Sequence, residues 1–265
     1  SFMKKNKFLL VSILFLAIFL VQPQNFQTLK SAFTQNDLPS QLNISNSSEE
    51  KNVDLGNSHQ TQNEELKSKV FDGQHQAIMV NDKAQFTAEE LSLKNGSWEK
   101  YSNLDFLNRV GVAEAMLGKD LMPTSEREDI SSVKPTGWKN KKIMFNGKQD
   151  FLYNRSHLIG FQLSGENANV KNLFTGTRAL NANFKDEKSS MVYYENLVAG
   201  YIKKTNHHVR YRVTPIFENV ELVARGIRLE AQSIEDDTLS FDVYIFNIQP
   251  GYEIHYLTGT SKKSQ

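Results

Sequence analysis

The last third of the chain alternates apolar and polar positions in three consecutive segments, residues 209–215, 222–231 and 240–248. A two-residue period is typical of strands that bury one face. The short connections between these segments favour neighbouring antiparallel strands in one sheet. In the first segment Arg210 and Arg212 fall on the same side, so that strand is expected to have a basic polar face.

The middle of the chain shows helical spacing instead. Residues 189–203 repeat apolar side chains every three or four positions, which predicts a helix, and residues 104–117 show a similar pattern. A short strand is predicted at residues 77–81, and the pair Asn146-Gly147 predicts a hairpin turn. Helices that come before a run of strands predict an α+β fold, here with a central antiparallel sheet flanked by helices.

The N-terminal end has the pattern of an export signal. Lysines precede an uncharged, almost wholly apolar run at residues 8–21, which is short for a membrane span of about 20 residues and typical of a signal peptide. Residues 1–23 are therefore expected to be a signal peptide or an uncleaved N-terminal anchor. Residues 24–69 are polar and are expected to be a disordered spacer. Residues 70–258 have a globular composition and form the expected folded domain, followed by a flexible tail at 259–265.

Composition and charge limit the kinds of catalytic and binding sites that the chain can form. The 265-residue chain has a formal net charge of +1 and no cysteine, which excludes disulfides, thiolate nucleophiles and cysteine-based zinc sites. Six basic residues stand against one acid, Asp150, in the stretch from Lys134 to Arg155. Such a run is often only a solvated loop. Beside a phosphate-binding site, however, it would attract a nucleic acid.

That basic run leads into a candidate set of catalytic side chains. Arg155 and His157 are two residues apart and would project from the same face of a strand. Asn172, Asn181 and Glu195 follow, and Glu195 interrupts the apolar stripe of its predicted helix. Taken singly, each has an ordinary structural explanation: asparagine is common in turns, and a glutamate at the edge of a stripe can pair with a lysine. Together they supply a base, a phosphate ligand and oxygen donors for a hard cation.

The segment Asn154-Arg-Ser-His157 resembles the Asp-Arg-Gly-His signature of the DNA/RNA non-specific endonucleases, which have the ββα-metal (His-Me finger) fold. The resemblance extends over about residues 70–256. It is closest to the DNA-entry nucleases and the secreted phage-type DNases of Gram-positive bacteria. The further matching segments are 107–113, 122–127, 134–138, 172–181, 193–195 and 211–215.

The resemblance implies a role for each candidate residue. His157 matches the general base, Asn181 the direct metal ligand and Glu195 the carboxylate that holds metal-bound water. Asn172 matches an asparagine that supports the site, and Arg155 the signature arginine at the substrate phosphate. Further phosphate contacts are expected from the following two arginines: Arg127 and Arg178.

Two departures from the signature and one spacing affect the expected geometry. Asn154 and Ser156 replace the aspartate and the glycine of the signature, which leaves the role of these two positions open. Asn181 and Glu195 are 14 residues apart, and one continuous helix would separate them by about 21 Å. The chain is therefore expected to break near residues 184–188, so that a second helix brings Glu195 back.

The implied function is a sequence-non-specific endonuclease that hydrolyses DNA phosphodiester bonds with Mg²⁺, for which Mn²⁺ can substitute. DNA is the expected partner, mainly through its phosphates, with RNA as a second candidate substrate. The protein is expected to be a monomer, secreted or anchored on the extracellular surface, with the membrane contacted only through an uncleaved N-terminal segment. Two alternatives remain: a non-catalytic DNA receptor or uptake protein on the same scaffold, and an extracellular adhesin with the spacer as a stalk.

Overall fold

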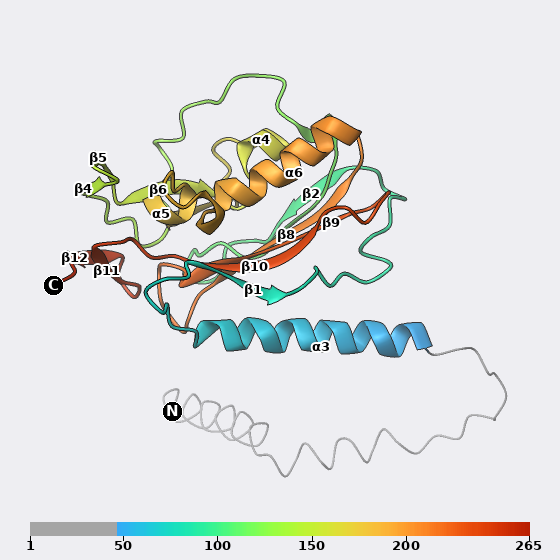
Figure 1. Ribbon diagram of the computed structural model, residues 1–265, viewed down its shortest axis with the longest axis horizontal. Helices are drawn as coiled ribbons and strands as arrows, with labels where there is room; N and C mark the ends of the chain where they lie inside the picture. The colour runs from blue at the N-terminus through green and yellow to red at the C-terminus, as the bar shows by residue number, and fades with distance from the viewer. Residues whose placement is uncertain (1–46) are drawn as a thin grey trace, which may run out of the picture. The chain divides into compact units, whose positions relative to one another are not determined.

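A computed structural model describes residues 47–265 of the chain (Figure 1). The expected signal peptide or anchor at residues 1–23, and residues 24–46 of the expected spacer, lie outside the described residues. The elements are α3 (Ser47–Lys67), β1 (Ala77–Asn81), β2 (Trp98–Tyr101), β3 (Ala113–Leu117), η1 (Lys119–Leu121), β4 (Lys142–Phe145), β5 (Lys148–Phe151), β6 (Tyr153–His157), α4 (Phe161–Ser164), β7 (Leu173–Thr177), α5 (Arg178–Asn181), η2 (Glu187–Ser189), α6 (Met191–Thr205), β8 (Val209–Ile216), β9 (Gly226–Ser233), β10 (Ser240–Phe246), β11 (Tyr252–His255) and β12 (Thr260–Lys263).

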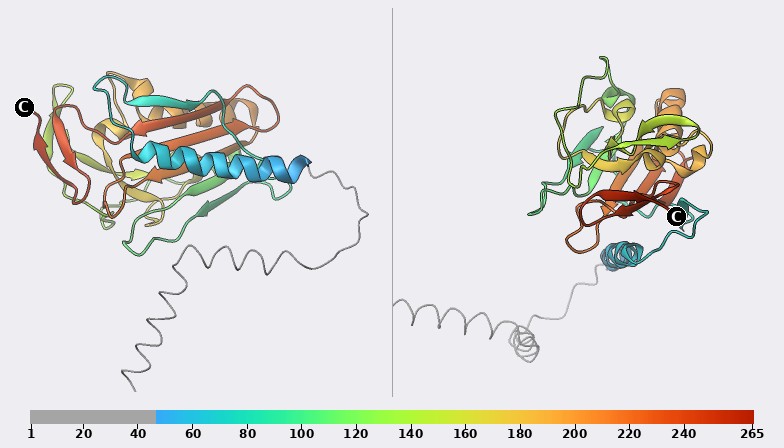
Figure 2. Two further views of the ribbon diagram at one scale, coloured as in Figure 1. Left: turned by 90° about the horizontal axis from the view of Figure 1, so that it is seen from below. Right: turned by 90° about the vertical axis from the view of Figure 1, so that its left-hand side faces the viewer.

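A six-stranded sheet forms the centre of the folded unit, with the strand order β1-β10-β9-β8-β3-β2. Every neighbouring pair in this sheet is antiparallel. The three alternating segments of the sequence become β8, β9 and β10, which lie side by side as predicted. The α+β prediction with a central antiparallel sheet and flanking helices is confirmed (Figures 1 and 2).

The two faces of this sheet differ in chemistry because β8 alternates strictly. Val209, Tyr211 and Val213 are fully buried in the main apolar core. Arg210 and Arg212 point to the opposite face, as the sequence predicted. In Figure 1, α4, α5, α6 and β6 lie on the apolar side and α3 lies on the charged side.

Helix α6 covers the apolar face. Its buried side chains Val198, Ala199 and Ile202 belong to the same core as the inward side chains of the sheet. The predicted helix at residues 189–203 is confirmed with slightly shifted ends: it starts at Met191 and ends at Thr205, and the C-cap residue Asn206 has a positive φ of 58°. Burial of this stripe holds the rest of α6, including Glu195, against the sheet.

The region predicted as a helix at residues 104–117 is instead a turn followed by strand β3. The Asp105 carboxylate accepts the backbone N–H groups of Leu107 and Arg109, and Asn108 adopts a positive φ of 61°. These local bonds compete with helix formation. The prediction was wrong because β3 gains a full ladder with β8, which apolar spacing alone does not reveal.

A smaller core lies at one end of the unit, where the hairpins β4–β5 and β11–β12 meet. The predicted turn is confirmed, with Asn146 and Gly147 at φ of 52° and 76°. The Tyr153 hydroxyl, at the start of β6, donates to the Gly259 carbonyl and links β6 to the β11–β12 hairpin. Residues 259–265 were expected to be a flexible tail, but Thr260–Lys263 pair with β11 as strand β12.

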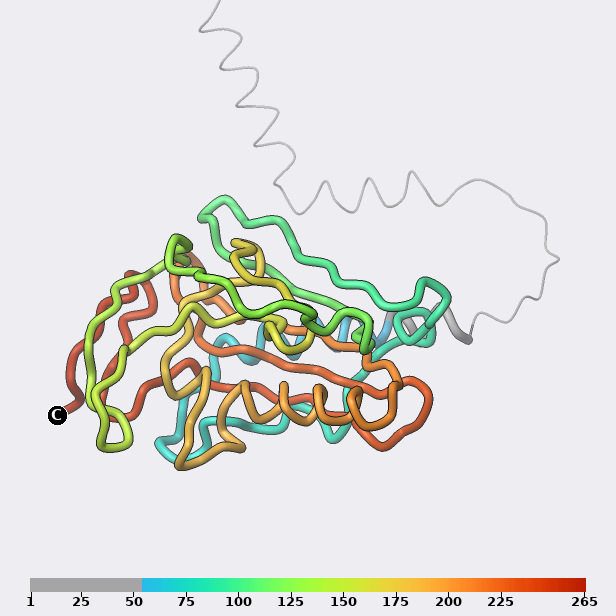
Figure 3. The backbone as a smooth tube through the Cα atoms, turned by 90° about the horizontal axis from the view of Figure 1, so that it is seen from above, coloured from blue at the N-terminus to red at the C-terminus, as the bar shows by residue number. Residues whose placement is uncertain are grey.

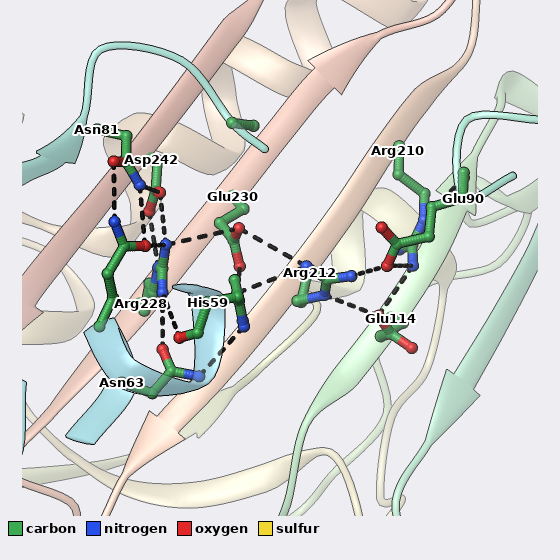
Figure 4. Close-up of polar contacts among 12 residues, drawn as sticks. His59, Asn63, Asn81, Glu90, Glu114, Arg210, Arg212, Arg228, Glu230 and Asp242 are labelled. Carbon is green, nitrogen blue, oxygen red and sulfur yellow. Dashed lines mark hydrogen bonds and ion pairs between the residues drawn. The ribbon is translucent and has the colours of Figure 1, made fainter. Parts of the chain in front are cut away.

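Helix α3 covers the charged face of the sheet through polar contacts (Figure 4). Arg228 and Asp242 are fully buried there as a two-pronged ion pair, with N–O distances of 2.9 and 2.7 Å. From α3, Gln62 and Asn63 accept hydrogen bonds from the same guanidinium. His59 contacts the buried Glu230 at 2.7 Å.

These contacts explain a difference from the sequence analysis, which assigned residues 24–69 to a disordered spacer. In the structure Ser47–Lys67 form helix α3 and belong to the same compact unit as the sheet. The segment is mostly polar because many of its contacts are with buried ions, and Leu66 adds a buried apolar contact near its end. Within residues 47–265, no helix is long and apolar enough to cross a membrane.

We predict that Arg228→Ala lowers the free energy of unfolding by about 3–5 kcal/mol, because it leaves the buried Asp242 carboxylate without its charge partner. Arg225→Ala is the matched control, since Arg225 is half-exposed and its ion pairs lie near the surface. Urea denaturation of both variants measures the difference. Similar small losses in the two variants would contradict a structural role for the ion pair.

Candidate active site

The candidate site is built on a ββα unit. Strands β6 and β7 pair antiparallel, so that His157 lies opposite Leu173 at the end of β6. Helix α5 follows β7 directly, and the Thr177 hydroxyl caps it by accepting the Leu180 backbone N–H at 3.0 Å. This connection places Asn181, the last residue of α5, beside the strand that ends in His157.

His157 is buried, with 7 % of its surface exposed. Its Nε2 lies 2.9 Å from the Asn167 carbonyl oxygen, which can only accept, so Nε2 carries the proton. Burial lowers the pKa of His157 below its ordinary value, and the nearby Arg127 charge lowers this pKa further. The imidazole is therefore neutral near pH 7, with its lone pair on Nδ1.

Asn172 holds the segment that follows His157. Its Oδ1 accepts the Ile159 backbone N–H at 2.8 Å, and its Nδ2 donates to the Ile159 carbonyl at 3.0 Å. The Asn172 carbonyl also accepts the Leu158 N–H. The side chain is fully buried, and both its amide oxygen and its amide nitrogen are hydrogen-bonded. Its geometry suits support of the site rather than contact with a substrate.

Asn181 is half-buried, and its Oδ1 accepts a hydrogen bond of 2.9 Å from the Ser156 hydroxyl. The predicted break after this residue is confirmed. The chain leaves the helical conformation after Asn181, forms the short η2 turn and starts α6 at Met191. Helix α6 then packs against both α4 and α5 (Figure 3). This packing brings Glu195 back to Gly160, close to the ββα unit.

The Glu195 carboxylate lies directly over Gly160, at the start of α4. A Cβ atom on Gly160 would come within 2.7 Å of both the carboxyl carbon and Oε2 of Glu195. Burial raises the pKa of Glu195 to about 7, against the lowering effects of Gln162 and the Arg127 charge. The hydroxyl of Tyr211 has no hydrogen-bond partner among the described residues, and the Glu195 charge adds to the burial that raises the Tyr211 pKa.

The three candidate phosphate-binding arginines differ in availability. Arg127 is exposed, stacks over the Phe161 ring at 5.2 Å, and is close enough for its charge to lower the pKa of both His157 and Glu195. Arg155 and Arg178 are already engaged with protein groups. Arg155 donates to the carbonyls of Ser131 and Val133, and its guanidinium lies over the Trp138 ring. Arg178 forms an ion pair with the Asp150 carboxylate.

The oxygen donors at the candidate site suit a divalent cation. Within residues 47–265, no group of three or more His, Cys, Asp and Glu side chains could hold a metal ion. Asn181 and Glu195 offer amide and carboxylate oxygens, which suit a hard cation such as Mg²⁺ or Mn²⁺. Such a cation keeps several waters when few protein ligands are present. The residues therefore fit a divalent cation held mainly through water.

Comparison with known proteins decides the family. The sequence model of the DNA/RNA non-specific endonucleases matches residues 91–235, which is more than half of the chain. This chain belongs to the DNA/RNA non-specific endonuclease family. The resemblance stated from the sequence is thus confirmed, and the fold is the ββα-metal fold that it implied.

Solved nuclease structures agree with this assignment. NucA from Streptococcus agalactiae, with a magnesium ion bound, is 27 % identical, with a TM-score of 0.62 over 70 % of this chain and 86 % of NucA. The Sda1 nuclease, with a bound zinc ion, is 28 % identical, with a TM-score of 0.62 over 72 % of this chain and 97 % of Sda1. An extracellular endonuclease of 20 % identity shares the fold, with a TM-score of 0.51 over 73 % of this chain and 100 % of its own.

Sequence reasoning about this endonuclease missed three contributions. The Asn167 carbonyl orients the His157 ring, and a backbone group leaves no signal in side-chain spacing. Gly160 leaves room for the Glu195 carboxylate, which its position three residues after His157 could have suggested. Ser156 binds Asn181, and its departure from the family signature was the available signal.

We predict that Gly160→Ala moves the Glu195 carboxylate and costs this endonuclease no more than about 1 kcal/mol, because the new methyl group overlaps only the far end of that flexible side chain. Gly200→Ala is the matched control, since an added Cβ meets nothing within 4 Å on the exposed side of α6 and should stabilise the helix by up to about 1 kcal/mol. Urea denaturation measures both effects. The packing is disproved if Gly160→Ala stabilises the protein as much as Gly200→Ala does, because nothing would then have had to move.

We predict that Glu195→Gln stabilises the metal-free endonuclease more at pH 8 than at pH 5. The folded state raises the Glu195 pKa to about 7, so it retains a proton that the unfolded chain releases near its ordinary pKa of about 4.3. Stability from this group therefore falls as pH rises between these values and is constant above them. Thermal unfolding in EDTA at both pH values measures the difference, and an equal effect at the two would contradict the burial of this carboxylate.

Proposed function

We propose that the chain is a sequence-non-specific, Mg²⁺-dependent endonuclease that hydrolyses phosphodiester bonds of DNA, with RNA as a second candidate substrate. Membership of the endonuclease family makes it a nuclease. The proposed metal-dependent hydrolysis is supported above all by one observation. His157 is held neutral by burial, with its Nε2–H fixed on a backbone carbonyl, in the same ββα unit that carries Asn181.

In the proposed reaction, Nδ1 of His157 takes a proton from the water that attacks phosphorus. A base whose pKa lies below its ordinary value is free at neutral pH, and the fixed ring needs no reorientation. A divalent cation held at Asn181, with Glu195 orienting its waters, would neutralise charge on the phosphate as the leaving oxygen departs. Asn172 holds the backbone after His157 in place and takes no part in proton transfer.

Arg127 is proposed as the main phosphate ligand. It is exposed, and its charge lowers the pKa of both His157 and Glu195, which supports a position near the proposed reacting groups. Arg155 keeps further N–H groups beyond the two that it donates to the loop, so it remains a proposed phosphate contact. Arg178 is a weaker candidate because Asp150 already pairs with it.

DNA binding is proposed to depend on phosphates rather than on bases. Four lysines near the site are exposed and make no ion pair among the described residues: Lys134, Lys139, Lys142 and Lys148. Such a surface attracts any duplex through counterion release, so affinity should fall steeply with salt. Phosphate binding does not require the two-fold pairing that sequence-specific dimers use, so we propose that the protein acts as a monomer.

The proposed location is outside the cell, secreted or anchored on the surface. The pattern of lysines and apolar residues at 1–23 is typical of an export signal. The absence of cysteine means that this fold depends on its apolar cores instead of disulfides. Two structures that share the fold are of an extracellular endonuclease and an extracellular nuclease.

We predict that His157→Ala lowers the rate of plasmid nicking by a factor of about 10²–10⁴, the usual contribution of a general base, and leaves DNA binding intact. EDTA should stop cleavage by the parent protein, and Mg²⁺ or Mn²⁺ should restore it. His255→Ala is the matched control, because His255 is an exposed histidine in the β11–β12 hairpin. Nicking rates are followed on agarose gels.

Each contrary outcome has its own meaning. Unchanged cleavage by His157→Ala would remove this residue from the mechanism, and full activity in EDTA would remove the metal. Retained DNA binding by the parent protein, without cleavage in any divalent cation, would support the alternative of a non-catalytic DNA receptor.

A further inference from the structure

Ser156 occupies the position of the signature glycine and lies on the opposite face of β6 from His157. Its side chain is buried, with 1 % of the residue exposed, and its hydroxyl donates to Asn181 Oδ1 at 2.9 Å. A buried hydroxyl of this kind needs a partner, and Asn181 provides it. A glycine at position 156 could not make this contact.

The neighbouring strand is built to admit this side chain. A Cβ atom on Gly176 of β7 would come within 2.3 Å of the Ser156 hydroxyl oxygen and 2.8 Å of its Cβ. Any larger residue at position 176 would therefore displace the hydroxyl. The pair of Ser156 and Gly176 fills the space between β6 and β7 in a way that directs the hydroxyl toward α5.

The contact restrains a side chain that is otherwise weakly held. Asn181 ends a helix of only four residues, and it is half-buried. Its Oδ1 has two lone pairs, so one can accept the Ser156 proton while the other remains for a cation. Hydrogen bonds to the ligands of a metal site fix their orientation, and losing them typically weakens metal binding by about 10–100-fold.

We propose that Ser156 is a positioning residue that orients Asn181 as the metal ligand of this nuclease. This inference rests on the proposed role of Asn181. Ser156 is not itself a nucleophile, because its hydroxyl is buried and donates to an amide oxygen instead of to a base. The glycine of the family signature has no side chain that could hold Asn181 in this way, whereas Ser156 does.

The test measures metal binding directly, without DNA, by titrating the full chain with Mn²⁺ and following the free ion by electron paramagnetic resonance. Ser156→Ala and Ser156→Gly are expected to raise the dissociation constant about tenfold. Thr175→Val is the matched control: it removes a buried hydroxyl from β7 that donates to the Thr136 carbonyl, and it should leave Mn²⁺ affinity unchanged.

A second readout separates positioning from general damage. The Mg²⁺ concentration for half-maximal nicking should rise about tenfold in Ser156→Ala, while the rate at saturating Mg²⁺ and the melting temperature stay close to those of the parent protein. A merely structural role would instead lower the melting temperature and leave the metal requirement unchanged.

Asn181→Ala tests the proposed metal site separately from the proposed role of Ser156. If it weakens Mn²⁺ binding and the Ser156 variants do not, Ser156 has no positioning role, although the metal site stands. If Asn181→Ala leaves Mn²⁺ affinity unchanged, Asn181 is not the ligand, and both the proposed metal site and the role of Ser156 are overturned.

Discussion

The pairing of β6 with β7 determines which side chains of the candidate site can meet. In its register His157 lies opposite Leu173 and Ser156 opposite Phe174. A shift by one residue would exchange the two faces of β6 and bury the base where the serine lies. The same pairing sets the start of α5, since Thr177 both ends β7 and caps the helix. The positions of the base and of Asn181 are thus set by one ladder of backbone hydrogen bonds.

Burial then determines the charge states of the reacting groups. Desolvation lowers the pKa of His157 and raises that of Glu195, because in both cases it disfavours the charged form. The Arg127 charge lowers the pKa of both groups, so it opposes the effect of burial at Glu195 and adds to the effect of burial at His157. At neutral pH the His157 imidazole is therefore uncharged, and a bound cation would readily ionise the Glu195 carboxylate. Both charge states support the proposed metal-assisted hydrolysis.

The central sheet has one apolar face and one charged face, and each face holds a helix in place. Its apolar face packs α6 and so holds Glu195 over Gly160. Its other face carries the Arg228–Asp242 pair and neighbouring ions, which α3 covers with amide and imidazole groups (Figure 4). Buried ions contribute little net stability but penalise any arrangement that leaves them unpaired. This explains how a helix of polar composition has a defined place on the sheet.

The sequence by itself determined the features that depend on local periodicity and on ordered motifs. It predicted β8 to β10, α6, the Asn146-Gly147 turn, the break before Glu195, and the family. Tertiary structure alone decided that residues 113–117 form a strand, that α3 docks on the sheet, and that residues 260–263 pair with β11. The strand at residues 113–117 and the docking of α3 depend on partners far along the chain, whose hydrogen bonds and ion pairs outweigh local preference. The bond from Ser156 to Asn181 is of the same kind, because 25 residues separate two side chains that only the ββα unit brings together.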